Sequence, residues 1–260
     1  MHSEDIVFVR ADWARFAPYA AEHYRNNKII LDSFLEDHLQ KANHYRMEYS
    51  GETVGYFAIA NQSTLVFFHV CDAYARFGQA LFARAKRYEN VTNAMVPTGD
   101  EFFLSHAADA FTRLEKQAYF AVYPKLAPQV QLCPLTLRLL DVAADAELLK
   151  KAGDFFDDDI EKIKAGGNGH IYAAEAEGKT VGFGIMDPSV LVNYASIGMY
   201  VLEEYRRKGY AGSILSRLSQ MAREQNLQAV SGCWYYNHNS KKSMESAGGY
   251  TKTRLLRFYF

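Results

Sequence analysis

The stretch Tyr200–Gly212, YVLEEYRRKGYAG, decides the fold of this 260-residue chain. Apolar residues before it predict a β-strand, and the apolar spacing of residues 214–225 predicts an amphipathic helix. Between the two elements, Gly209 and Ala211 have small side chains that allow a ligand to approach the backbone. The N–H groups at a helix N-terminus are unpaired and lie at the positive end of the helix dipole, so the stretch predicts a diphosphate site. Three cationic residues add positive charge there: Arg206, Arg207 and Lys208.

The same pattern occurs earlier in the chain. V-x-[DE]-x-Y-x-R-x-G-x-A begins at Val70 and again at Val201, 131 positions later. A second repeat agrees with the first, because GETVGY from Gly51 recurs as GKTVGF from Gly178. Repeats of this length are too long for solenoid units. They predict two related domains.

A connector separates the two copies. Residues 121–134 contain three of the six prolines and cannot continue a helix. We therefore expect an N-terminal domain over residues 1–125 and a C-terminal domain over residues 133–260. In the second half, residues 171–176 and 181–186 predict a hairpin across a Glu-Gly-Lys turn. Both halves are predicted to be mixed α/β, each with a twisted, mostly antiparallel mixed sheet flanked by helices.

Composition excludes several classes of protein. A chain that is 49% hydrophobic and 23% charged is typical of a folded globular protein. Its net charge of -1 argues against a nucleic-acid-binding function. Three cysteines are an odd number, and the eight histidines show no metal-ligand spacing, so neither a disulfide framework nor a metal site is predicted. The acidic N-terminal sequence and the lack of a long apolar run predict a cytoplasmic protein that does not enter membranes.

Taken together, these features make residues 135–260 resemble the GCN5-related N-acetyltransferase superfamily. The family motif [RQ]-x-x-G-x-[GA] is matched by residues 206–211, and its later Asn and Ser correspond to Asn237 and Ser240. The resemblance implies tandem acetyltransferase domains that use acetyl-CoA and no metal. Loop amides would hold the diphosphate, and the preceding strand would contact the pantetheine arm. The residues that the resemblance assigns to acetyl-CoA are Met199, Val201, Arg206, Arg207, Lys208, Gly209, Tyr210, Ala211, Gly212, Asn237 and Ser240.

The resemblance also implies direct attack of a neutral amine on the thioester. Many members of the family place a tyrosine after the Asn/Ser pair to protonate the leaving thiolate, and here that position falls on Met244 or Glu245. Candidates for this acid are therefore water, Tyr235, Tyr236 and Tyr250. Candidates for the base that deprotonates the amine are Glu175, Asp187 and Glu203.

The first copy of the pattern is less basic than the second. Gly78 and Ala80 are retained, but Ala75 and Phe77 stand where the second copy has cationic residues. We therefore expect one active site, in the second half, which transfers an acetyl group to a primary amine of a small molecule. An acyl-CoA-binding scaffold without activity and a protein N-acetyltransferase are the alternatives, and homodimer formation is left open.

Overall fold

The computed structural model describes residues 5–124 and 132–260, which divide into two compact units. Unit 1 comprises Met1–Ala118 and Thr253–Phe260, and unit 2 comprises Tyr119–Lys252. The last strand of the chain therefore completes the first unit.

This division differs from the expected domains 1–125 and 133–260. The sequence repeats define two continuous halves, but the last strand of each half is divided between the two units. The first half ends with β6 (Arg113–Val122), whose residues from Tyr119 onward belong to unit 2, and the second half ends with β12 (Tyr250–Tyr259), whose residues from Thr253 onward belong to unit 1. Residues 125–131, most of the predicted connector, lie outside the described part of the chain.

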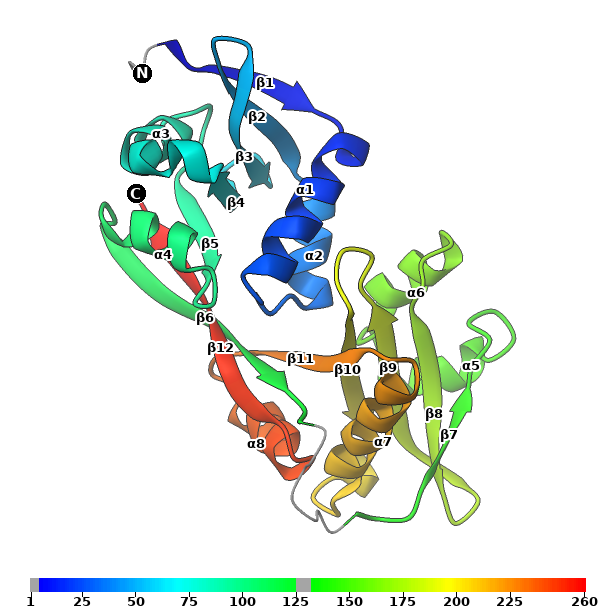
Figure 1. Cartoon of the computed structure of the whole chain (residues 1–260). Helices are drawn as coiled ribbons and strands as arrows, with labels where there is room; N and C mark the ends of the chain where they lie inside the picture. The colour runs from blue at the N-terminus through cyan, green and yellow to red at the C-terminus, as the bar shows by residue number, and fades with distance from the viewer. Residues whose placement is uncertain (1–4, 125–131) are drawn as a thin grey trace. The chain divides into compact units, whose positions relative to one another are not determined.

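Unit 1 is a sheet with helices on both sides (Figure 1). Its strands lie in the order β1-β2-β3-β4-β5-β12-β6. The strands are β1 (Val7–Ala11), β2 (Asn43–Tyr49), β3 (Glu52–Ala60), β4 (Thr64–Val70), β5 (Asn93–Pro97), β6 (Arg113–Val122) and β12 (Tyr250–Tyr259). The helices are α1 (Trp13–Asn26), α2 (Ser33–Gln40), α3 (Gly78–Ala85) and α4 (Glu101–Ala108).

Successive side chains of β4 point to opposite faces of this sheet, because side chains alternate along a β-strand. Phe67 packs against Phe16 of α1 with ring centroids 5.1 Å apart. Its neighbour Phe68 packs against Phe82 of α3 at 5.0 Å. A strand buried on both faces explains the continuous apolar run of β4 in the sequence.

Unit 2 has the strand order β6-β11-β10-β9-β8-β7. Its further strands are β7 (Thr136–Leu139), β8 (His170–Ala176), β9 (Lys179–Pro188), β10 (Tyr194–Val201) and β11 (Gln228–Trp234). Its helices are α5 (Ala146–Leu149), α6 (Asp157–Lys164), α7 (Tyr210–Glu224) and α8 (His238–Ser246). The predicted hairpin is confirmed as the antiparallel pair β8–β9, in which Ala173 lies opposite Phe183.

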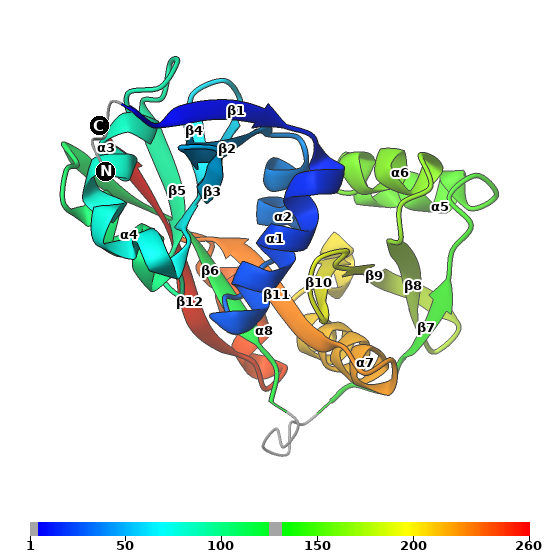
Figure 2. The same cartoon turned by 45° about the horizontal axis from the view of Figure 1, so that its top comes forward.

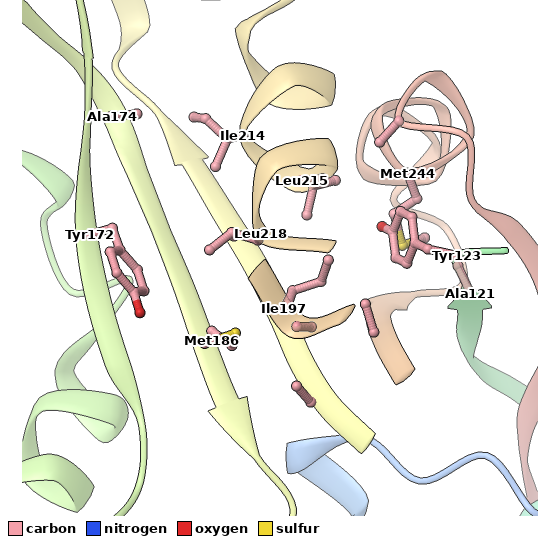
Figure 3. Packing of buried hydrophobic residues seen from close by; sticks show 14 of the residues in the cluster. Ala121, Tyr123, Tyr172, Ala174, Met186, Ile197, Ile214, Leu215, Leu218 and Met244 are labelled. Carbon is pink, nitrogen blue, oxygen red and sulfur yellow. The ribbon is translucent and has the colours of Figure 1, made fainter. Parts of the chain in front are cut away.

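Helices cover both faces of the unit 2 sheet, with α5 and α6 on one side and α7 on the other (Figure 2). Ile214, Leu215 and Leu218 of α7 pack in one cluster with Ala174 and Ile197 of the strands (Figure 3). A second cluster joins α5 and α6 to the opposite face of the sheet, and its fully or nearly buried members include Leu149, Phe156, Ala173 and Phe183. The alternation of β8 side chains between the two clusters fixes the register of the strand.

None of the helices in residues 5–124 and 132–260 is long and apolar enough to cross a membrane.

Candidate functional site

The central strands of unit 2 separate from each other partway along their length. β10 and β11 run parallel and pair only through Tyr194–Gln228, Ala195–Ala229 and Ser196–Val230. Beyond this point, the Ser231 hydroxyl donates a hydrogen bond to the Ile197 carbonyl over 2.7 Å. The edge of β10 that follows therefore faces a gap rather than a neighbouring strand.

The loop after β10 leads directly into α7 through two residues in the left-handed backbone region. Arg207 has φ 60 and Gly209 has φ 89. The first backbone hydrogen bond at this end of the helix runs from Ser213 N to Gly209 O over 3.2 Å. The N–H groups of residues 210–212 consequently have no acceptor within the helix, and such groups bind anions well.

A cavity of about 810 Å³ opens at this helix N-terminus. It is bounded by the end of β10, by the loop before α7 and by one face of α8. Its lining residues are Phe155, Met199, Tyr200, Val201, Tyr205, Arg206, Arg207, Gly209, Tyr210, Ala211, Gly212, Asn237, Asn239, Ser240, Lys242, Ser243 and Ser246. The structure thus brings all the residues assigned to acetyl-CoA by the sequence to one cavity, except Lys208.

The three cations of the loop take different positions. Arg206 turns back toward β10, where its Nε donates a hydrogen bond to Val201 O over 3.1 Å. Arg207 lines the cavity. Lys208 is not among the lining residues, and its ammonium lies 5.3 Å from the centroid of the Tyr205 ring. Arg206 therefore supports the end of the strand, while Arg207 contributes positive charge at the cavity wall.

Asn237 fixes the start of α8 at the cavity. Its side-chain oxygen accepts a hydrogen bond from Ser240 N over 3.1 Å, which makes it the N-cap of the helix. The cap explains why these two residues occur three positions apart in the sequence.

The candidate catalytic residues lie elsewhere in unit 2. Glu175 forms an ion pair with Arg138 at 3.0 Å, and buried Asp187 forms one with Lys162 at 2.7 Å. Glu203 is exposed in the short 3-10 turn before the loop. None of these three carboxylates is among the residues that line the described cavity.

The candidate tyrosines are also not among the residues that line the described cavity. Tyr235 stacks on Tyr119 with ring centroids 4.5 Å apart. Tyr236 and Tyr250 are 53% and 51% exposed. At the family's usual tyrosine position, Met244 is buried in the core and the Glu245 carboxylate accepts a hydrogen bond from Lys241.

Sequence reasoning missed several residues of the cavity wall. One signal could have found most of them, because Asn239, Lys242, Ser243 and Ser246 follow the spacing of a single helix face. Phe155 had no such signal. It lies before α6, where its ring is 5.1 Å from that of Tyr200. Tyr200 and Tyr205 complete the aromatic part of the lining.

The corresponding helix of unit 1 has a different environment. A Cβ built on Gly78, the first residue of α3, would come within 2.8 Å of the Phe102 ring and closer still to His106 of α4. The Gly78 N–H also donates a hydrogen bond to Ala75 O of the preceding 3-10 turn, so this helix does not begin with the free N–H groups found at α7. Within the described residues, no group of three or more His, Cys, Asp or Glu side chains could hold a metal ion.

Comparison with known families identifies both halves of the chain. Residues 14–123 match an acetyltransferase (GNAT) domain, and residues 138–248 match the acetyltransferase (GNAT) family. The chain therefore belongs to the GNAT acetyltransferase family and contains two tandem GNAT domains, as the sequence predicted. No curated protein matches the chain.

Solved structures share this fold. A GNAT-family acetyltransferase from Colwellia psychrerythraea has a TM-score of 0.84 at 15% identity, with 98% of this chain and 99% of that chain covered. A GCN5-related N-acetyltransferase from Sphaerobacter thermophilus gives 0.60 at 13% identity, over 98% and 95% of the two chains. A tandem GNAT protein from the clavulanic acid biosynthesis pathway gives 0.59 at 14% identity, over 97% of each chain. These similarities support the mixed α/β tandem fold.

Proposed function

We propose that unit 2 binds acetyl-CoA and transfers its acetyl group to a primary amine of a small molecule. The observation that carries the proposal is the cavity at the N-terminus of α7, where the unpaired N–H groups of the helix meet the open edge of β10. Membership in an acetyltransferase family supports the same reaction.

The residues present fit the coenzyme. A diphosphate requires several N–H donors and positive charge, and residues 209–212 together with Arg207 and Lys242 supply both at the wall of the cavity. A pantetheine arm requires exposed backbone groups, and the unpaired edge of β10 around Met199 supplies them. Asn237 and Ser240 add polar groups on the opposite wall.

When bound, acetyl-CoA supplies an activated thioester. The nitrogen of the amine would form a bond to the acetyl carbon as the carbon–sulfur bond breaks, and a backbone N–H near Val201 would stabilise the negative charge on the carbonyl oxygen. An ammonium group with a pKa near 10 must first lose a proton, and solvent water would accept it because none of the three candidate carboxylates lines the described cavity. Water is a sufficient proton donor for the departing thiolate, because a thiol pKa of about 8.5 makes it a good leaving group near neutral pH.

Binding and turnover test the proposal together. CoA at about 100 times its dissociation constant should stabilise the native state by about 2.7 kcal/mol in a thermal melt. Acetyl-CoA with a panel of primary amines should then release free thiol above the rate without amine, and mass spectrometry should find an acetylated amine. Absence of CoA binding would overturn the proposal.

One observation favours a second function. The position where many relatives carry a tyrosine that acts as the acid falls on Met244 or Glu245. Met244 is packed in the core, and Glu245 forms an ion pair with Lys241. An acyl-CoA-binding protein without activity would bind CoA in the melt yet release no thiol with any amine. The same pair of measurements therefore separates the two functions.

A further inference from the structure

Cys133 contacts the loop before α7 although it lies far away in the sequence. Its thiol donates a hydrogen bond to Lys208 O over 3.0 Å, and its backbone N–H donates one to Ser213 Oγ over 2.8 Å. The Ser213 hydroxyl in turn donates to Gly209 O over 3.2 Å. We call Cys133 and Ser213, with these three hydrogen bonds, the clamp, because together they hold the loop before α7.

The clamp fixes two successive carbonyl groups of the loop. Lys208 O accepts a hydrogen bond from the Cys133 thiol, and Gly209 O accepts one from the Ser213 hydroxyl in addition to the backbone bond from the Ser213 N–H. The described chain contains no cis peptide bond, so the N–H of each peptide points away from its C=O. Holding these two carbonyls therefore aims the N–H groups of Gly209 and Tyr210 away from the clamp.

Such fixing is needed because the loop conformation is not one that an isolated chain prefers. Arg207 adopts a positive φ, which is uncommon for a residue with a side chain, and Gly209 adopts one as well. Cys133 also packs under this turn, because a Cβ on Gly209 would lie 3.0 Å from its sulfur. Without the clamp, the loop would sample other orientations of the same N–H groups.

We propose that Cys133 and Ser213 are positioning residues that preorganise the diphosphate-binding N–H groups of residues 209 and 210. This inference rests on the proposed function, because it assigns the clamp to the binding of acetyl-CoA. Neither side chain is among the residues that line the described cavity, so the clamp acts through the backbone of the loop.

Three variants test the proposal in the full chain. Cys133→Ala removes the thiol donor, Ser213→Ala removes the hydroxyl, and Cys133→Ser restores a donor at the first position. Ser219→Ala is the matched control. Ser219 is a buried serine of the same helix, 2% exposed against 3% for Ser213, and it accepts a hydrogen bond from Arg223.

Cys133→Ala loses one hydrogen bond of the clamp and is expected to raise the dissociation constant of CoA about five-fold in isothermal titration. Ser213→Ala loses two and is expected to raise it at least as much. The KM for acetyl-CoA should rise equally, while kcat at saturating acetyl-CoA stays unchanged. Cys133→Ser should bind CoA nearly as wild type does. Ser219→Ala should lower the melting temperature without changing CoA affinity.

The outcomes separate this inference from the proposed function. If wild type binds CoA and both alanine variants bind it equally well, the clamp has no positioning role. A fall in affinity for Ser219→Ala equal to that for Ser213→Ala would also overturn it, because a general loss of helix stability would explain both. Failure of the wild-type protein to bind CoA would overturn the proposed function and this inference with it.

Discussion

Gly78 and His106 are in such close contact that the imidazole of His106 occupies the space that a Cβ on Gly78 would need. In unit 2 the equivalent Gly209 stands at the edge of a cavity. The Gly78 N–H is paired with Ala75 O in the 3-10 turn that leads into α3, whereas residues 210–212 at the start of α7 line the cavity. The two copies of one sequence pattern consequently differ in what they can bind.

We therefore expect one molecule of CoA to bind per chain. Phe102 and His106 would have to leave the N-terminus of α3 before a diphosphate could reach it, and their rings are packed together at 4.3 Å. Isothermal titration of the full chain with CoA should give a stoichiometry near one. A stoichiometry near two for the wild-type chain would contradict this expectation.

Gly209→Ala should abolish most CoA binding and lower stability. Its φ of 89 is unfavourable for a residue with a Cβ, and the added atom would press on the Cys133 sulfur. A loss of about 1–2 kcal/mol in the free energy of unfolding is expected from the backbone alone. Chemical denaturation and CoA titration measure the two effects.

Gly178→Ala is the matched control for this substitution. Gly178 has φ 72 in the turn between β8 and β9, and no atom lies within 4 Å of the Cβ position. The variant should lose a similar free energy of unfolding and still bind CoA. Equal losses of CoA affinity in both variants would show that general destabilisation, rather than the loop, controls binding.

Much of unit 2 was predictable because its signals are local. The apolar runs of β8 and β9 on either side of a Glu-Gly-Lys turn and the glycine-containing loop before α7 are both patterns of neighbouring residues. The pairing of the last strand, β12, with a strand of the first half was not predictable. Leu255 of β12 lies opposite Pro97 of β5, which is far away in the sequence. The sequence pattern of a strand does not identify the strand with which it pairs. Phe155 was missed for a similar reason, because a loop side chain is placed by tertiary packing.

Tyr236→Phe and Tyr250→Phe should leave turnover unchanged. Both rings are more than half exposed, and neither lines the described cavity. Their hydroxyls are thus poorly placed to protonate a thiolate on the coenzyme, and proton transfer requires hydrogen-bond reach. Steady-state kinetics with the best amine of the panel checks both variants. A fall in kcat of about 100-fold or more for either would identify it as the general acid.

A fragment cut at the sequence-predicted boundary should fold poorly. Residues 133–260 lack Tyr119–Tyr123, which include Ala121 and Tyr123 at 0% and 2% exposed. The Tyr123 hydroxyl is 3.0 Å from Ser231 Oγ, and its carbonyl accepts a hydrogen bond from Gln228. Loss of one buried aromatic residue alone costs about 3–5 kcal/mol.

The fragment 113–252 is the matched comparison, because it keeps the whole of unit 2 together with the start of β6. Circular dichroism should show a cooperative thermal transition for residues 113–252 and a weaker or absent one for residues 133–260. Equal melting temperatures would mean that β6 is dispensable for unit 2.

Histidine 69 should make the native state less stable as pH falls. Burial lowers its pKa to about 4, and neighbouring His23 lowers it further, against the raising effects of Asp100 and Asp72. The Nδ1 atom of His69 is buried with no hydrogen-bond partner in the described structure.

The sign follows from the pKa values of the two states. Between about pH 6.5 and 4, the unfolded chain binds a proton at His69 that the native state excludes. The stabilising contribution is therefore complete above pH 6.5 and is lost as pH falls through this window, by at most about 3 kcal/mol. Asp32, whose pKa is raised to about 7 by burial, acts in the opposite direction, so a variant comparison is needed.

His69→Phe isolates the effect, since it keeps an aromatic ring beside Tyr19 and removes the titrating group. Denaturant unfolding at several pH values from 4 to 7 should show the variant gaining stability relative to wild type as pH falls. Because Asp32 is present in both proteins, its contribution cancels in the difference. A difference that does not change with pH would mean that His69 titrates alike in the folded and unfolded states.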